Sequence, residues 1–128
     1  MQPGCPFCEV EPERIRLEAE VGLAIRDLFP VADGHLLVIP RRHVASLYDL
    51  TASEQTALWD LTRDARNLLI DELRPDGFTI GLNEGMAAGQ SVDHSHLHVI
   101  PRYLGDVPDP TGGIRAIFPH RARYWERR

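Results

Sequence analysis

Three histidines at alternate positions form the feature that most restricts how this chain folds. His94, His96 and His98 are separated by Ser95 and Leu97, and Val99 follows. Successive side chains of a β-strand point to opposite faces, so this spacing predicts a strand over about 94–101 with the three imidazoles on one face. Three imidazoles in one row are hard to explain by packing alone. The segment therefore predicts a functional site.

The geometry of a strand limits what this row can bind. Side chains on one face are about 6.6–7 Å apart, so the outer two histidines are about 13 Å apart. One metal ion with ligands at about 2 Å can bind two neighbours but hardly all three. At least one imidazole is therefore free for other chemistry. A neutral imidazole is a nucleophile near pH 7, and a protonated one stabilises phosphate oxygens.

The periodicity of the remaining chain predicts an α+β domain. A capping box at Thr51 and Glu54 begins an amphipathic helix of about five turns, which Pro75 and Gly77 end. Strands are expected at 14–18, 23–29, 35–39 and 78–83, in addition to 94–101. We expect an antiparallel sheet of about five strands, with the long helix on one face and one shorter helix or turn.

Length and composition favour one domain without nucleic-acid or membrane partners. The 128 residues suit a single domain over 1–128, with an N-terminal cysteine segment at 1–12 and a C-terminal tail at 103–128. A formal charge of −5 argues against binding to duplex nucleic acid. No apolar run approaches the ~18 residues of a membrane helix, and residues 1–20 lack the pattern of a secretory signal. A cytoplasmic protein is expected.

The two cysteines, Cys5 and Cys8, are only three residues apart. A disulfide framework needs distant pairs, so this spacing favours a metal site or a redox pair. A redox Cys-x-x-Cys usually follows a strand and opens a helix, whereas only four residues precede Cys5. Two histidines from elsewhere would complete a tetrahedral zinc site. A free or redox-active thiol pair is the alternative.

Four segments in order resemble the histidine triad (HIT) superfamily: the strand with Asp27, residues 34–43, the loop 83–91, and the triad followed by Pro101-Arg102. The resemblance implies the HIT fold, a homodimer and no organic cofactor. It also implies a structural zinc ion, whose four ligands would be Cys5, Cys8, His43 and His94.

The resemblance assigns roles to the remaining residues of the pattern. His96 is the expected nucleophile and His98 the residue that binds phosphoryl oxygens. Asp27 is expected to bind the ribose hydroxyls. His35 is expected to support the triad or line the nucleotide site, and Asn83 to lie near the phosphates or the sugar. Gln90 and Ser91 precede the triad, where an amide and a hydroxyl can bind the phosphates or the leaving group.

The function implied is nucleotidyl hydrolysis or transfer at the α-phosphate of a nucleoside 5′-phosphoryl compound, through a covalent nucleotidyl-His96. The substrate would be a dinucleoside polyphosphate, such as a diadenosine polyphosphate, or a nucleoside phosphoramidate, and the product an AMP-like mononucleotide. Two alternatives remain open at this stage. One is a mononuclear metal-dependent hydrolase that uses the histidine row. The other is a non-catalytic nucleotide-binding protein.

Overall fold

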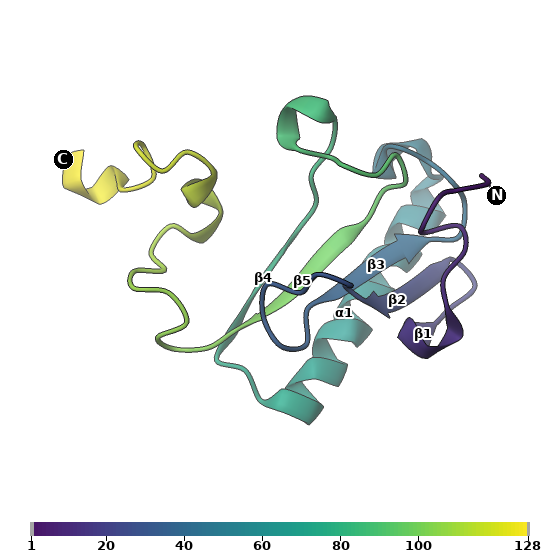
Figure 1. The fold of residues 1–128 in the computed structure, drawn as a ribbon, viewed down its shortest axis with the longest axis horizontal. Helices are drawn as coiled ribbons and strands as arrows, with labels where there is room; N and C mark the ends of the chain where they lie inside the picture. Colours follow the sequence, from purple (N-terminus) through teal and green to yellow (C-terminus); the bar gives the residue numbers. More distant parts are fainter. Residues whose placement is uncertain (1, 128) are drawn as a thin grey trace.

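The computed structural model describes residues 2–127, so Met1 and Arg128, the outermost residues of the predicted domain, lie outside the description. Five strands form one sheet in the order β1-β2-β3-β5-β4, with every neighbouring pair antiparallel. One long helix, α1, packs on the sheet (Figure 1). The predicted α+β fold is confirmed. The bounds are β1 Ile15–Glu18, β2 Gly22–Arg26, β3 Leu36–Pro40, α1 Ala52–Leu73, β4 Gly77–Gly81 and β5 Leu97–Arg102.

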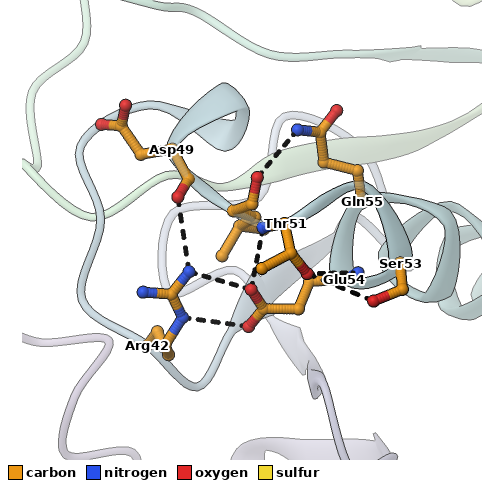
Figure 2. A network of polar contacts seen from close by, with 7 residues as sticks. Arg42, Asp49, Thr51, Ser53, Glu54 and Gln55 are labelled. Carbon is orange, nitrogen blue, oxygen red and sulfur yellow. Dashed lines mark hydrogen bonds and ion pairs between the residues drawn. The ribbon is translucent and has the colours of Figure 1, made fainter.

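The predicted capping box begins α1. The Glu54 N–H donates to Thr51 Oγ1 at 3.1 Å, and the Thr51 N–H donates to Glu54 Oε1 at 2.9 Å. Arg42 donates to both carboxylate oxygens of Glu54 at 2.9 Å and to the Asp49 carbonyl at 3.3 Å (Figure 2). The bonds from Arg42, and next the bond from the Thr51 N–H, lower the pKa of Glu54 to about 2. This network fixes the loop after β3, which carries His43, to the first turn of the helix.

The helix has 22 residues, about six turns rather than the predicted five. It ends at Arg74, which has the left-handed φ of 48°, and Pro75 follows. Among residues 2–127, no helix combines the length and the apolar composition needed to cross a membrane.

Apolar side chains cover both faces of the central strands. On the α1 face the buried residues come from the sheet, the helix and the loop between them: Ala24, Leu36, Val38, Leu47, Leu50, Leu58, Leu61, Ala65, Leu69, Leu97 and Val99. On the opposite face, the N-terminal segment packs on β2 and β3 through Cys5, Phe7, Leu23, Ile25, Leu37 and Ile39. His98 of β5 lies on this second face, because it is paired with Leu37 in the sheet.

The last strand begins at Leu97 and not at His94, so the prediction that all three histidines share one strand is wrong. The reason lies at the end of β3. Pro40 has no N–H to offer to the sheet, and its carbonyl accepts a hydrogen bond from His94 Nε2 at 2.7 Å. The His94 side chain thus bonds to the β3 backbone beyond Val38 and Leu97, the last residues of the two strands that pair. Only His98 lies within β5.

Three predicted site residues lie at strand ends instead of within strands. Asp27 follows β2, His35 precedes β3, and Asn83 follows β4 at a distance of two residues. Asp27 leaves the strand because its Oδ1 accepts from the Phe29 N–H at 2.8 Å, the bond of an Asx turn. Strand ends and loops are the usual positions of residues that bind ligands.

The C-terminal tail is less irregular than predicted. It contains two 3-10 helices, η4 (Gly113–Ile117) and η5 (Tyr124–Arg127). Figure 1 shows that this yellow segment runs away from the sheet. The tail also contacts itself, since Arg123 pairs with Asp109 at 3.1 Å.

Candidate functional site

Two cysteines and two histidines meet beside the end of β3. Cys8 Sγ lies 3.3 Å from His43 Nδ1 and 3.6 Å from His94 Nδ1, and Cys5 Sγ lies 3.5 Å from the same His94 atom. One ligand atom from each of the four residues lies within 4.8 Å of the other three. The fold thus brings together, from three separate parts of the sequence, the four residues predicted as metal ligands. This group could hold a metal ion.

The chemistry of these four residues fits a zinc-like ion. The Pro40 carbonyl can only accept a hydrogen bond, so His94 carries its proton on Nε2 and directs the lone pair of Nδ1 at both sulfurs. A metal-binding histidine usually has such a partner on its other nitrogen. Burial raises the pKa of the Cys5 thiol and lowers the pKa of His94. A cation between them would favour the thiolate and the neutral imidazole that ligation requires.

His96 is buried next to this group, with 8% of its surface exposed. Its Nδ1 lies 2.9 Å from the His94 carbonyl oxygen, and its ring contacts the rings of Phe7 and His98 at centroid distances of 5.0 and 5.3 Å. The carbonyl fixes the proton of His96 on Nδ1. The lone pair is therefore on Nε2.

His98 belongs to a second chain of hydrogen bonds. The Val31 N–H donates to His35 Nδ1 at 3.2 Å, so a neutral His35 carries its proton on Nε2. That nitrogen lies 2.9 Å from His98 Nδ1 and 3.4 Å from Asp27 Oδ2. Because His98 Nδ1 accepts a hydrogen bond from the His35 Nε2–H, a neutral His98 carries its own proton on Nε2. Burial lowers the pKa of both His35 and His98, so both rings are neutral near pH 7.

Asp27, His35 and His98 also form a group whose ligand atoms lie within 4.8 Å of one another. A metal ion there would need the lone pair of His35 on Nε2. The Val31 N–H occupies the Nδ1 lone pair and so favours a proton at Nε2. The hydrogen bond to His98 thus occupies the place where an ion would bind.

A cavity of about 650 Å³ opens beside His98, over β4 and β5. His35 and His98 form part of its wall, and residues from β4 form another part. Asn83 lies at the cavity, and Ile114 and Ile117 of the tail complete it. A cavity of this size suits a small organic ligand.

Gln90 and Ser91, the two residues before the triad that were predicted to bind the phosphates or the leaving group, have different surroundings. The Gln90 amide is engaged by backbone groups: its Oε1 accepts from the Gly85 N–H at 2.8 Å, and its Nε2 donates to the carbonyls of Ala45 and Val92 at 2.8 and 3.0 Å. It therefore braces the loop. Ser91 is exposed.

Several groups that shape the site could not be found from sequence patterns. The Pro40 carbonyl and the Val31 N–H are backbone atoms and have no sequence signature of their own. Phe7 lies between the two cysteines, and its ring packs edge-on against His94 and His96. In the sequence, only the position of Phe7 between two candidate metal ligands indicated that its ring belongs to the site.

Comparison with known proteins identifies the class to which this fold and site belong. Residues 9–105 match the family model described as the HIT domain. The chain therefore belongs to the HIT domain family.

Individual relatives agree with this assignment. The AP-4-A phosphorylase of Mycobacterium tuberculosis is 38% identical over 123 residues, which cover 90% of this chain and 63% of that protein. The bis(5′-adenosyl)-triphosphatase of Dictyostelium discoideum is 37% identical over 93 residues, or 73% of this chain and 62% of that protein. The chain thus spans less than two thirds of the length of both relatives. A solved HIT family structure from Bacillus subtilis superposes with a TM-score of 0.75 at 34% identity, covering 80% of this chain and 76% of that one.

Proposed function

We propose that this chain cleaves nucleoside 5′-phosphoryl compounds at the α-phosphorus through a covalent nucleotidyl intermediate on His96. The observation that carries the proposal is the 2.9 Å hydrogen bond from His96 Nδ1 to the His94 carbonyl. This bond leaves a lone pair on Nε2 and holds the ring in one orientation. An oriented neutral imidazole is a suitable nucleophile for phosphorus.

The reaction has two steps. In the first, the Nε2 lone pair of His96 forms a bond to phosphorus, and the bond from phosphorus to the leaving group breaks with its electron pair on that group; a polyphosphate leaves as the anion, and an amide leaves as ammonia after it takes a proton from solvent. In the second, the oxygen of water or of inorganic phosphate attacks phosphorus, the P–N bond breaks and returns its electrons to Nε2, and the proton of an attacking water passes to solvent. The proton on Nδ1 keeps the substituted ring cationic, which makes it a good leaving group.

His98 supports both steps from the neighbouring position. Its Nε2–H, fixed by His35, donates to a non-bridging phosphoryl oxygen, where charge increases in the transition state. Asp27 is proposed to accept hydrogen bonds from ribose hydroxyls. Ser91 and Asn83 are exposed. Ser91 is proposed to offer its hydroxyl to the phosphates or the leaving group, and Asn83 to bind near the phosphates or the sugar. Gln90 acts by holding the loop that carries Ser91.

The names of the relatives support dinucleoside polyphosphates as the substrate class, with nucleoside phosphoramidates as the smaller alternative. The second-step acceptor decides the product. Water would release AMP from a diadenosine polyphosphate, and inorganic phosphate would release ADP. Products formed with and without phosphate distinguish hydrolysis from phosphorolysis.

We also propose that Cys5, Cys8, His43 and His94 hold a structural zinc ion. The ion would supply folding free energy by joining the N-terminal segment to the residues that precede β5. It would also hold His94, whose carbonyl orients the nucleophile. Elemental analysis of the purified protein tests this assignment directly.

The test of the main proposal compares wild type with His96→Ala on diadenosine polyphosphates and on adenosine 5′-phosphoramidate. We expect a loss of at least ~10³-fold in kcat with AMP binding retained, the order observed when a covalent nucleophile is removed. His120→Ala, which changes an exposed histidine of the tail, is the matched control and should keep full activity.

Other outcomes would identify the alternatives. Retained turnover in His96→Ala, together with loss of wild-type activity on brief chelation, would indicate a metal-dependent hydrolase. Saturable AMP binding without turnover of either substrate by the wild type would indicate a non-catalytic nucleotide-binding protein.

A further inference from the structure

We propose that Phe7 is a positioning residue for the reaction: its ring fixes the plane of the His96 imidazole, and with it the direction in which the attacking Nε2 points. The inference rests on the proposed function, because it takes His96 as the nucleophile. Phe7 acts only through the ring of His96, which separates its role from that of the groups proposed to contact the substrate.

The need for such a residue follows from the freedom of a histidine side chain. The torsion that turns the ring about its bond to Cβ is broad, so the rotamer alone does not define the plane of the His96 ring. The 2.9 Å hydrogen bond from Nδ1 to the His94 carbonyl decides which nitrogen faces that oxygen. It holds only one atom, and Nε2 is two bonds away. A tilt of the ring therefore moves the Nε2 lone pair unless packing prevents it.

Two aromatic contacts limit this tilt. The ring centre of Phe7 lies 5.0 Å from that of His96, with 62° between the planes, and the corresponding values for His98 are 5.3 Å and 66°. Both distances are in the range of edge-to-face contacts between aromatic rings. Only 8% of His96 is exposed, so neighbouring groups surround the ring closely. His98 is proposed to bind the phosphoryl oxygens, which leaves Phe7 as the contact whose role is packing.

Phe7 is itself held in place, as a group that positions another must be. It is buried in the apolar cluster that covers β2 and β3. The N–H groups of Cys8 and Glu9 donate to the Cys5 carbonyl at 3.2 and 3.4 Å and close a turn around it. Its ring also packs edge-on against His94 at a centroid distance of 5.9 Å. One ring thus contacts both a predicted metal ligand and the proposed nucleophile.

The proposed chemistry depends on this direction. In the first step the lone pair of Nε2 has to meet phosphorus, and a displacement of about 1 Å at a reacting atom can lower a rate by about 10²-fold. The loss falls on kcat and not on KM, because the groups proposed to bind the substrate are other residues. A positioning role therefore differs measurably from a role in substrate binding.

The experiment compares Phe7→Leu with the matched control Phe78→Leu in the full chain. Both changes replace an aromatic ring by an aliphatic side chain, but Phe78 packs on the α1 face of the sheet, opposite the face of His98. On diadenosine tetraphosphate and on adenosine 5′-phosphoramidate, Phe7→Leu should lower kcat by at least ~10-fold while KM and AMP binding change by less than ~2-fold. Phe78→Leu should keep the wild-type kcat.

A second variant covers the case in which Phe7→Leu does not fold. Phe7→Met fills the same space with a flexible side chain and no flat ring, so the same loss in kcat is expected. All assays are made well below the thermal midpoint of each variant. Metal content is measured in parallel and should equal that of wild type, since both cysteines and both histidines of the metal group are kept.

The orientation of the ring is measured directly by NMR. In wild type above pH 7.5, two-bond proton–nitrogen correlation spectra should show His96 as a single tautomer with the proton on Nδ1. In both Phe7 variants the two nitrogen shifts should approach each other, because a ring that tilts away from the His94 carbonyl shares its proton between the two nitrogens. The Phe78→Leu spectrum should match wild type.

These measurements separate the inference from the proposed function. Unchanged kcat in the Phe7 variants, or a fall in kcat with unchanged His96 signals, would overturn the inference even when His96→Ala supports the proposed function. A rise in KM at constant kcat would overturn it as well. If wild type cleaves neither substrate while the Phe7 variants still change the His96 signals, the proposed function fails and the orientation of His96 by Phe7 is supported.

Discussion

His94 and His98 are four residues apart, and their surroundings differ in nearly every respect. His94 is fully buried, donates from Nε2 to a carbonyl, and directs Nδ1 at two sulfur atoms, so both of its nitrogens face protein groups. His98 is only partly buried, accepts at Nδ1 from His35, and lies in the wall of an open cavity. The same type of side chain therefore lies in two different environments, which differ in what its second nitrogen faces: two sulfur atoms at His94 and an open cavity at His98.

His96 lies between these two regions and is joined to both. Its Nδ1 bonds to the backbone of His94, and its ring contacts that of His98. The comparison predicts that changes at the cysteine–histidine group act mainly on stability and metal content. Changes at the His35–His98 pair should act mainly on turnover.

Among the changes that test this comparison of the two regions, the largest effect is expected for His98→Ala. Removing one oriented donor to a phosphoryl oxygen should lower kcat by about 10²–10³-fold, while AMP binding changes little. Thermal unfolding and metal content should remain close to wild type, because the ring is partly exposed and lies outside the four-residue metal group. A loss of metal in this variant would contradict the separation of the two regions.

The reverse pattern is expected for Cys8→Ser. Without one thiolate the group should lose its metal, and the thermal midpoint should fall by about 10 °C or more, or about 2–3 kcal/mol for a domain of this size. Turnover measured well below the new midpoint should fall less than in His98→Ala. Metal content by elemental analysis and thermal unfolding by circular dichroism check both parts, with His120→Ala, an exposed residue outside the metal group, as the control. Unchanged metal content would remove the zinc site.

The smallest effect concerns pH. Burial lowers the pKa of His35 and His98 below the ordinary value of 6.5. The unfolded chain therefore binds more protons than the folded one in the window below about pH 6.5, and the free energy of unfolding should decrease as the pH falls from 7.5 through 6.5 toward 5. Thermal midpoints across this range should show a shallower decrease in His98→Ala than in wild type. Equal slopes would show that this pair does not titrate as its burial requires.

The fold was predictable to the extent that local periodicity decides it. The leucine spacing and the Thr51 cap define α1, and alternating apolar residues define the strands, because both patterns follow from where a backbone places successive side chains. The ends were less predictable. The last strand begins three residues later than expected because Pro40 and His94 interrupt the ladder, and that interruption depends on two segments that are 54 residues apart.

The amino-acid sequence by itself determined which chemical groups are available: two thiols with a fixed spacing, three imidazoles at alternate positions, and a resemblance that named their partners. Only the tertiary structure decided how each group is used. A proton on imidazole has two possible positions, and the choice depends on the neighbours that tertiary packing supplies. Here those neighbours include the Val31 N–H and the Pro40 carbonyl. Such backbone groups occur in every protein, and it is the fold that places these two against His35 and His94. The cavity beside His98 arises in the same way, since its walls come from four distant segments that meet only when the sheet forms.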